Sequence, residues 1–243
     1  MRTISNDSKV ALVTGSTRGI GFAIAERLAN DGFYVVTNGR SKPAKIIGAR
    51  HIVADVSKSS EVNDLVAELK SQFRNIDVLV CNVGSGRQID EINSPQRWEH
   101  YLSLNLFSSV LLVEALMGES LLRNAKIIGI SSIAGSIATP APIEYSASKA
   151  ALNSFFKNMA FQHAGAGINF NMIALGNVLF PGSTWEDKIN SNKNMFNKYL
   201  VEKIPAKRFA SLAEVADVAS FLASTKCDFM TGATITVDGG QSL

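Results

Sequence analysis

Tyr145 and Lys149 stand four residues apart at the start of a long apolar run that extends to Phe161. If that run is helical, the two side chains share one face of its first turn. A phenol with an ordinary pKa of about 10 is a poor acid or base near neutrality. A neighbouring ammonium group and a helix N-terminus both favour the phenolate and so lower that pKa. The pair is therefore a candidate proton-transfer device, although the same spacing also occurs on ordinary solvated helix faces.

A glycine-rich turn lies near the N-terminus, between a short apolar run and a segment with helical periodicity. The run from Val10 to Val13 predicts a buried strand, and Phe22 to Asn30 predicts a helix. Strand, glycine-rich turn and helix form the setting in which backbone N–H groups bind a pyrophosphate. The spacing is Gly-x-x-x-Gly-x-Gly, and a purely structural turn of similar composition is the alternative. The candidate cofactor residues of this turn are Gly15, Ser16, Thr17, Arg18, Gly19, Ile20 and Gly21.

The residues after the second predicted strand, 32–37, bear on which dinucleotide binds. Folds that select NAD place an acidic residue there, facing the ribose 2′-hydroxyl. This chain has Gly39 followed by Arg40, with Arg18 in the glycine-rich turn. Two guanidinium groups without a carboxylate suit a 2′-phosphate. The sequence therefore favours NADP(H) over NAD(H), unless Arg40 is simply a surface residue.

The rest of the chain alternates apolar runs of strand length with amphipathic segments. Further strands are predicted at 51–55, 77–81, 126–130, 168–173 and 233–237. Further helices are predicted at 61–73, 96–122 and 212–224. This alternation indicates an α/β fold, a doubly wound parallel sheet of about seven strands with helices on both faces. The link from Arg40 to His51 is too short for a normal crossover helix, so that crossover is reduced or missing. No linker divides the chain, which predicts a single domain over residues 1–243.

Composition and charge argue against several classes of function. The 243 residues are 46% hydrophobic and 19% charged with a net charge of +3, and no basic run suggests a nucleic acid. Cys81 and Cys227 are far apart and the histidines form no cluster, so neither a metal site nor a disulfide is expected. The polar N-terminus lacks the apolar segment of a signal peptide. The apolar run around Val110 to Met117 is interrupted and shorter than a membrane span. We therefore expect a cytoplasmic protein that binds no membrane.

Several further motifs fall in a fixed order along the chain, with thirteen residues from Ser132 to Tyr145. In their joint order and spacing they resemble the short-chain dehydrogenase/reductase family, in its compact single-domain branch, from Val10 to the C-terminus. The resemblance implies a Rossmann-like fold that binds a dinucleotide. It rests on the glycine-rich turn and on Asp55, Val56, Asn82, Val83, Gly84, Asn105, Ser132, Tyr145 and Lys149.

The resemblance implies a catalytic role for four of these residues. Tyr145 would be the general acid toward a substrate carbonyl as hydride arrives from the nicotinamide. Lys149 would lower the tyrosine pKa and hold the nicotinamide ribose, and Ser132 would hydrogen-bond the developing oxyanion. Asn105 would anchor a water chain to Lys149 through its backbone carbonyl, with a purely structural Asn105 as the alternative. Cofactor contacts are implied for Asp55, Val56, Asn82, Val83, Gly84, Tyr145, Lys149, Gly176 and Val178.

The chain departs from the family pattern around the nicotinamide. Leu175 stands where the family usually has a proline before Gly176. Phe180 stands where a threonine commonly contacts the nicotinamide carboxamide, which removes one hydrogen bond to the ring. The mostly polar segment 180–205 is predicted to be a substrate lid with short helices. Its Trp185 either stacks on a substrate or packs within the lid.

The implied activity is the NADP(H)-dependent interconversion of a carbonyl and a secondary alcohol. The C-terminal half resembles 3-oxoacyl-carrier-protein reductases, which implies an acyl substrate on a carrier. The segment 181–188 resembles reductases of surface-polysaccharide pathways, so a sugar or nucleotide-sugar is the alternative substrate. A non-catalytic dinucleotide-binding regulator is the alternative of another class. Because 104–117 and 150–161 carry surplus apolar residues and the family commonly pairs these helices, we also predict a homotetramer.

Overall fold

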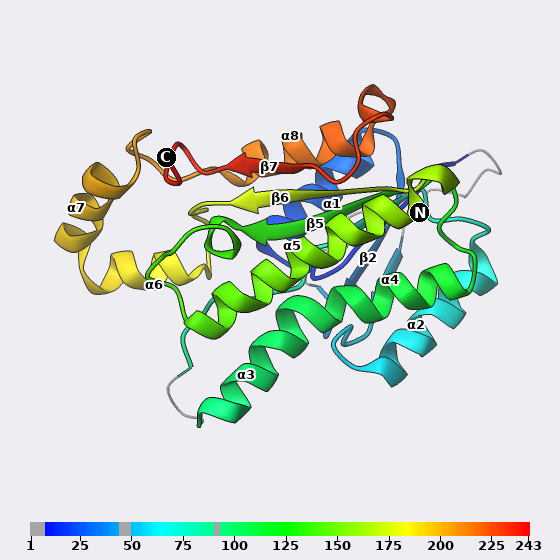
Figure 1. Cartoon of the computed structure of the whole chain (residues 1–243), viewed down its shortest axis with the longest axis horizontal. Coiled ribbons are helices and arrows are strands. Elements are labelled where there is room, and N and C mark those ends of the chain that lie inside the picture. Colours follow the sequence, from blue (N-terminus) through cyan, green and yellow to red (C-terminus); the bar gives the residue numbers. More distant parts are fainter. Residues whose placement is uncertain (1–7, 44–49, 90–92) are drawn as a thin grey trace.

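A parallel β-sheet forms the centre of the computed structural model, which describes residues 8–43, 50–89 and 93–243 (Figure 1). Within that part of the chain the sheet has seven strands in the order β3-β2-β1-β4-β5-β6-β7. This order confirms the predicted doubly wound arrangement. The strands are β1 (Val10–Val13), β2 (Tyr34–Gly39), β3 (Arg50–Val53), β4 (Val78–Cys81), β5 (Lys126–Ser132), β6 (Asn169–Leu175) and β7 (Thr234–Val237).

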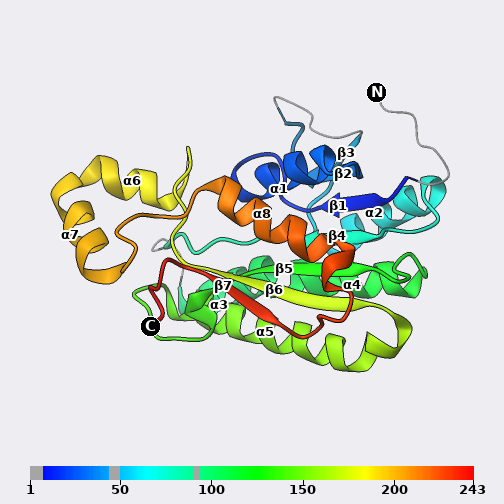
Figure 2. The ribbon, with the colours of Figure 1, turned by 90° about the horizontal axis from the view of Figure 1, so that it is seen from above.

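Helices cover both faces of the sheet. Figure 2 shows α1 (Gly19–Asn30) and α8 (Leu212–Ala223) on one side of the strands and α5 (Ile143–His163) on the other. The side chains of β1 follow the same division. Leu12 belongs to the core under α5, α2 (Ser59–Gln72) and α4 (Ser108–Gly118), and Val13 to the core under α1 and α8. Successive residues of a strand point to opposite faces, so a strand buried on both faces is apolar throughout.

The carboxyl ends of the strands share one edge of the sheet. Every described strand pair is parallel, and Ser132 at the end of β5 lies opposite Leu175, which in turn lies opposite Val237. The glycine-rich turn follows β1 at the same edge. Open α/β sheets bind their ligands at this edge.

The long helix predicted at 96–122 is interrupted in its middle. It consists of α3 (Ser94–Leu102), a π-helical turn over Ser103–Phe107, and α4. The side chain of Asn93 accepts a hydrogen bond from the backbone of Gln96 and so begins α3 two residues before the predicted start. The reduced crossover predicted after Arg40 includes residues 44–49, which lie outside the described residues.

The helical run from Ser94 to Gly118 is, among the described residues, the one stretch long and apolar enough to cross a membrane by length and composition. Its apolar residues have another explanation in this fold. Leu112, Val113 and Leu116 are fully buried in the core between α4 and the sheet. A core helix of a soluble protein satisfies the same test of length and composition.

The segment predicted as a lid contains two short helices, as expected. These are α6 (Thr184–Ser191) and α7 (Lys193–Lys203), which project from one end of the molecule (Figures 1 and 2). The ring of Trp185 lies 4.7 Å from that of Tyr199 and 4.8 Å from that of Phe209, between centroids. Trp185 therefore packs against Tyr199 and Phe209, and it remains partly exposed.

Candidate active site

Ser132, Tyr145 and Lys149 come together at the carboxyl edge of the sheet. Ser132 ends β5, and Tyr145 and Lys149 lie in the first two turns of α5. The Ser132 hydroxyl oxygen accepts a hydrogen bond of 3.2 Å from the backbone N–H of Ala134. The same hydroxyl is close enough to the Tyr145 phenol to lower the pKa of that phenol. The Nζ atom of Lys149 lies 6.0 Å from the centroid of the Tyr145 ring. The arrangement brings together the phenol of Tyr145, the hydroxyl of Ser132 and the amine of Lys149.

The pKa of Tyr145 differs from the sequence-based expectation. Burial raises the pKa of the phenol, and the hydrogen bond with Ser132 lowers it only in part, so the pKa lies above its ordinary value. The raised pKa differs from the lowering by Lys149 that the resemblance implied. The physical reason is that the ammonium group is directed elsewhere, since Nζ donates a hydrogen bond of 2.9 Å to the carbonyl of Ile130.

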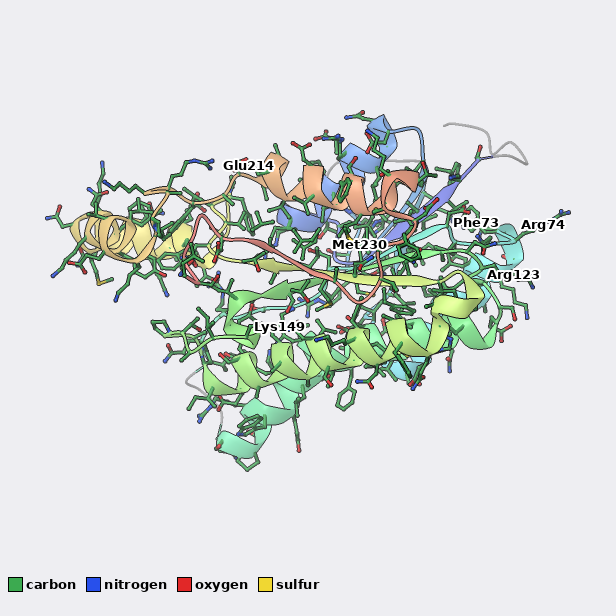
Figure 3. All side chains as sticks on the ribbon, turned by 45° about the horizontal axis from the view of Figure 1, so that its top comes forward. Phe73, Arg74, Arg123, Lys149, Glu214 and Met230 are labelled. Carbon is green, nitrogen blue, oxygen red and sulfur yellow. The ribbon has the colours of Figure 1, made fainter. Side chains whose placement is uncertain are left out.

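Lys149 is itself strongly perturbed by its surroundings. Its side chain is buried between α5 and the sheet (Figure 3). Burial without a carboxylate partner lowers the pKa of Lys149 from 10.5 to about 8. A Cβ atom added at Gly84 would lie 3.0 Å from Nζ, so the loop after β4 closes over the amine. The group can therefore hold or release a proton close to neutral pH.

Asn105 lies in the π turn between α3 and α4 and is completely buried. Its side-chain oxygen accepts from the backbone N–H of Ser85 at 2.8 Å, and its Nδ2 donates to the carbonyls of Ser85 (3.2 Å) and Tyr101 (3.0 Å). The side chain thus fixes the loop after β4 to the interrupted helix. Because π turns open the regular helical ladder, the backbone at Asn105 is a suitable place to hold a water molecule.

The glycine-rich turn has the shape that a pyrophosphate requires. Gly15 and Gly19 have φ values of +60° and +57°, which favour glycine. A Cβ atom at Gly21 would lie 2.4 Å from the Asn82 side chain, so the third glycine allows helix α1 to approach β4 closely. No side chain caps the first N–H groups of α1. These donors fit the phosphates of a dinucleotide.

Predicted cofactor residues at β3 and β4 divide into two kinds. Asn82 uses its amide within the protein, donating to the carbonyls of Thr14 (2.9 Å) and Gly15 (3.1 Å), so it positions the turn. Asp55 remains at the edge of the site beside Arg40. Burial acts to raise the pKa of Asp55, but hydrogen bonds from Ser57 and the nearby cation Arg40 hold it below its ordinary value. An ionised carboxylate there suits contacts to an adenosine.

The two arginines predicted to bind a 2′-phosphate have different surroundings. Arg40 is exposed directly after β2, where Thr17 of the glycine-rich turn packs on Gly39. Arg18 instead donates a hydrogen bond of 3.5 Å to the carbonyl of Gly182, at the base of the lid. Arg40 is thus exposed at the end of β2, whereas Arg18 contacts Gly182 at the start of the predicted lid.

The remaining predicted contacts lie where β6 leads to the lid. The backbone N–H of Gly176 donates to the carbonyl of Val237 at 3.0 Å, and Val178 forms a β-bridge with Ala210. Val56 and Val83 adjoin the ends of β3 and β4, and Val83 contacts Gly15. Together with the glycine-rich turn, these residues form a continuous border along the carboxyl edge of the sheet.

Residues around Tyr145 that the sequence did not single out also shape the site. The ring of Tyr101 lies edge-on to that of Tyr145, with centroids 6.5 Å apart, and its hydroxyl donates to the carbonyl of Arg87 at 2.6 Å. Glu144, directly before Tyr145, forms an ion pair of 3.1 Å with Arg97 of α3. Of these residues, only Glu144 could have been found from the sequence, because it directly precedes Tyr145. The other contacts depend on tertiary packing.

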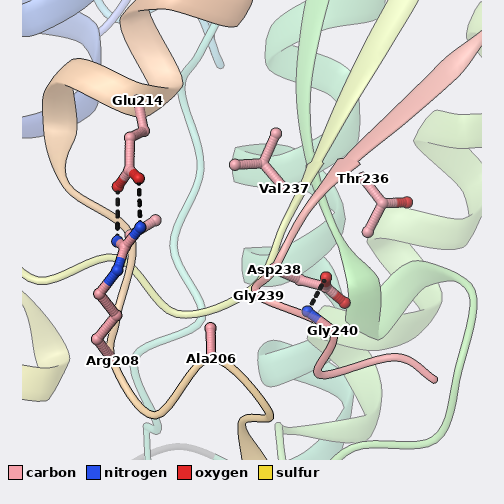
Figure 4. A pocket seen from close by; sticks show the side chains of 9 residues that line it. Ala206, Arg208, Glu214, Thr236, Val237, Asp238, Gly239 and Gly240 are labelled. Carbon is pink, nitrogen blue, oxygen red and sulfur yellow. Dashed lines mark hydrogen bonds and ion pairs between the residues drawn. The ribbon is translucent and has the colours of Figure 1, made fainter.

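A separate surface hollow of about 390 Å³ lies at the carboxyl end of β7 (Figure 4). Figure 4 shows the Arg208–Glu214 ion pair and the Asp238 carboxylate accepting from the N–H of Gly240. None of its lining residues is a predicted site residue. They are Ala206, Arg208, Ala210, Glu214, Thr236, Val237, Asp238, Gly239 and Gly240.

Comparison with known proteins agrees with this geometry. A family model described as enoyl-(acyl carrier protein) reductase matches residues 15–242. A 3-oxoacyl-[acyl-carrier-protein] reductase of Staphylococcus epidermidis is 33% identical, over 97% of this chain and 100% of the relative. Among solved structures, a gluconate 5-dehydrogenase from Burkholderia cenocepacia in complex with NADP and tartrate has a TM-score of 0.86 at 31% identity, with 97% and 96% of the two chains covered. An L-sorbose reductase from Gluconobacter frateurii complexed with NADPH and L-sorbose has a TM-score of 0.84 at 29% identity, with 96% of each chain covered. With its doubly wound sheet, its glycine-rich turn and its Ser132–Tyr145–Lys149 cluster, the chain belongs to the short-chain dehydrogenase/reductase family of oxidoreductases that act on CH–OH groups.

Proposed function

We propose that the protein is an NADP(H)-dependent reductase that converts a ketone into a secondary alcohol. The observation that carries the proposal is the meeting of Ser132, Tyr145 and Lys149 beside the glycine-rich turn. A non-catalytic regulator would not need a phenol, a hydroxyl and a perturbed amine around one point. Activity with NADPH on a panel of ketones tests the proposal, and cofactor binding without turnover of any ketone would favour the regulator.

In this proposal each residue acts on a stated atom. NADPH, when bound, supplies the hydride. Tyr145 donates its phenolic proton to the substrate carbonyl oxygen, and the Ser132 hydroxyl hydrogen-bonds the same oxygen as negative charge develops there. A phenol with a raised pKa holds its proton at neutral pH, which suits the reducing direction. Lys149 binds the ribose hydroxyls and returns a proton toward Tyr145, and the π turn at Asn105 connects that amine to water.

The cofactor preference leads to a direct prediction for Arg40. Replacement by alanine should weaken NADPH binding about 10-fold to 100-fold, because charge-assisted hydrogen bonds to a phosphate contribute about 1.5–3 kcal/mol. NADH lacks the 2′-phosphate, so its Kd should change by less than about twofold. Fluorescence titration with each cofactor measures both values. An equal loss for NADPH and NADH would contradict a 2′-phosphate contact.

The leading substrate class is a 3-oxoacyl thioester on an acidic carrier protein. It is supported by the curated relative at 33% identity and by the surface of the lid. Lys193, Lys198 and Lys203 are exposed along α7, and Lys207 follows it. Lys198 also pairs with Glu202 at 3.8 Å, and the remaining lysines of α7 suit an acidic carrier, because complementary charge steers association.

A hydroxylated ketone such as a keto-sugar is the second candidate, and one polar cluster favours it. The Tyr199 hydroxyl accepts hydrogen bonds of 2.9 Å from both Asn177 and Gln241. These side chains lie beyond β6 and β7, beside Gly176, where the distal part of a substrate would lie. Assays with acetoacetyl thioester and with L-sorbose, each with NADPH, separate the two classes. The preferred class should show a kcat/KM at least about tenfold higher, the equivalent of 1.4 kcal/mol in the transition state.

We also propose that the protein acts in the cytoplasm as a homotetramer. The support is the surface of α5 and of the adjoining π turn, where Phe161, Ile143 and Phe107 are 89%, 76% and 46% exposed. Large apolar side chains gathered on neighbouring helices commonly mark a subunit interface. Light scattering of the purified chain should give about four times the monomer mass of 26.1 kDa, and a monomeric mass would contradict the proposal.

A further inference from the structure

The aromatic ring of Phe180 lies directly on the glycine-rich turn. A Cβ atom built on Gly19 would lie 2.6 Å from Cε2 of Phe180 and 3.0 Å from its Cζ. The ring therefore fills the space that the missing side chain of Gly19 leaves open. It also packs, partly buried, against the edge of the core beneath α1 and α8.

A second contact joins the same two segments. Arg18 Nη1 lies 3.5 Å from the carbonyl oxygen of Gly182, and a Cβ atom at Gly182 would lie only 2.8 Å from that nitrogen. Two successive residues of the turn, Arg18 and Gly19, thus hold the segment from Phe180 to Gly182. This segment leads directly into lid helix α6.

The position of the ring conflicts with the binding of a dinucleotide. The N–H groups at the start of α1 are the donors for a pyrophosphate, and the absence of a side chain at Gly19 allows the phosphates to approach. A neutral aromatic ring cannot take the place of an anion there. The cofactor and the Phe180 ring therefore compete for the surface of Gly19.

We propose that the Phe180 ring covers the phosphate-binding turn and is displaced when NADP(H) binds. The inference rests on the proposed use of NADP(H). Because Phe180 is joined to α6 through Gly182, its displacement moves the base of the lid. Cofactor binding and lid position are then coupled, and the coupling is reciprocal.

The coupling makes a quantitative prediction for NADPH affinity. The apparent Kd of a protein that binds only in its open state equals the intrinsic Kd divided by the open fraction. Replacing Phe180 with alanine removes the covering ring, and Phe180→Leu removes part of it. If the turn is covered in most molecules, Phe180→Ala should lower the Kd for NADPH by about 3-fold to 10-fold, mainly through faster association, with a smaller change in Phe180→Leu.

The experiment combines NADPH fluorescence titration with stopped-flow association on the purified wild type and variants. Leu179→Ala is the matched control, since it removes an apolar side chain, 41% exposed, from the same segment. Its Kd and association rate should equal those of the wild type. Phe180→Leu retains apolar packing, so it replaces Phe180→Ala in the binding measurements if the alanine variant does not fold.

The possible results separate the inference from the proposed function. Tighter and faster NADPH binding in the Phe180 variants, but not in Leu179→Ala, supports the coupling. Equal Kd values and association rates in all four proteins overturn the inference and leave the proposed function standing. Weaker binding in the Phe180 variants also overturns it, because the ring would then support the cofactor. Absence of NADPH binding in every protein overturns both.

Discussion

Replacing Tyr145 with phenylalanine is expected to lower kcat for ketone reduction by about two to four orders of magnitude, the usual contribution of a general acid. The variant keeps the ring and its edge-on contact with Tyr101, so the fold should remain intact. It loses the one hydroxyl that can donate a proton beside Ser132 at the substrate oxygen. The Kd for NADPH should change by no more than a few-fold, because the phosphates bind at the glycine-rich turn and Tyr145 supplies at most one of the implied cofactor contacts.

Tyr101→Phe is the matched control for this experiment. It removes a hydroxyl from the neighbouring ring, and that hydroxyl donates to the backbone carbonyl of Arg87 at 2.6 Å. The loss of one buried hydrogen bond should cost about 1 kcal/mol of stability and leave kcat within a few-fold of the wild type. If Tyr145→Phe retained the wild-type kcat while Tyr101→Phe lost it, the acid would have to be sought elsewhere in the site.

The positions of the strands were predictable because the apolar runs have a clear local pattern. The fully apolar run Val10–Val13 could only be a strand buried on both faces, and parallel pairing then follows from the helices that separate the strands. The short helices of the lid were also predictable. The exact break in the helix at Ser103–Phe107 was not, because a π turn depends on packing around the buried Asn105 rather than on local propensity.

The candidate site was predictable as a set of residues but not as a set of interactions. The family resemblance grouped Ser132, Tyr145 and Lys149, and the structure places all three at the carboxyl edge of the sheet. Whether the pKa of Tyr145 is raised or lowered depends on the balance between burial and nearby charge. That balance can be judged only from the three-dimensional structure. The contact between Phe180 and Gly19 joins residues 161 positions apart in the chain, which no local pattern can show.

The buried Lys149 lowers the stability of the fold, and replacing it with methionine should show this directly. The methionine is of similar length and apolar, so it can occupy the buried space. The lowering of the lysine pKa from 10.5 to about 8 corresponds to about 3 kcal/mol of unfavourable burial at neutral pH. Loss of the hydrogen bond to Ile130 costs about 1–3 kcal/mol in return. We expect a net gain of about 0–2 kcal/mol in the free energy of unfolding at pH 7, and a loss of activity of about 100-fold or more.

The pH dependence of this gain has a definite sign. The pKa of Lys149 is lower in the folded protein, so between about pH 8 and 10.5 the unfolded chain binds more protons at this position. Stability of the wild type therefore rises with pH across that range, because the buried amine becomes neutral. The advantage of Lys149→Met should be greatest below pH 8. Near pH 10.5 the sign should reverse, because the neutral amine still donates to the Ile130 carbonyl and methionine cannot.

Urea unfolding of the cofactor-free protein at pH 7, 9 and 10.5 measures this difference. Lys157→Met is the matched control, since Lys157 is exposed on the same helix and its replacement should change stability by less than about 0.5 kcal/mol at each pH. If the wild type and Lys149→Met had equal free energies of unfolding at pH 7, 9 and 10.5, burial of Lys149 would carry no penalty. The predicted reversal would instead show that the fold tolerates an unfavourable charge at the place where the reaction needs an amine that titrates near neutral pH.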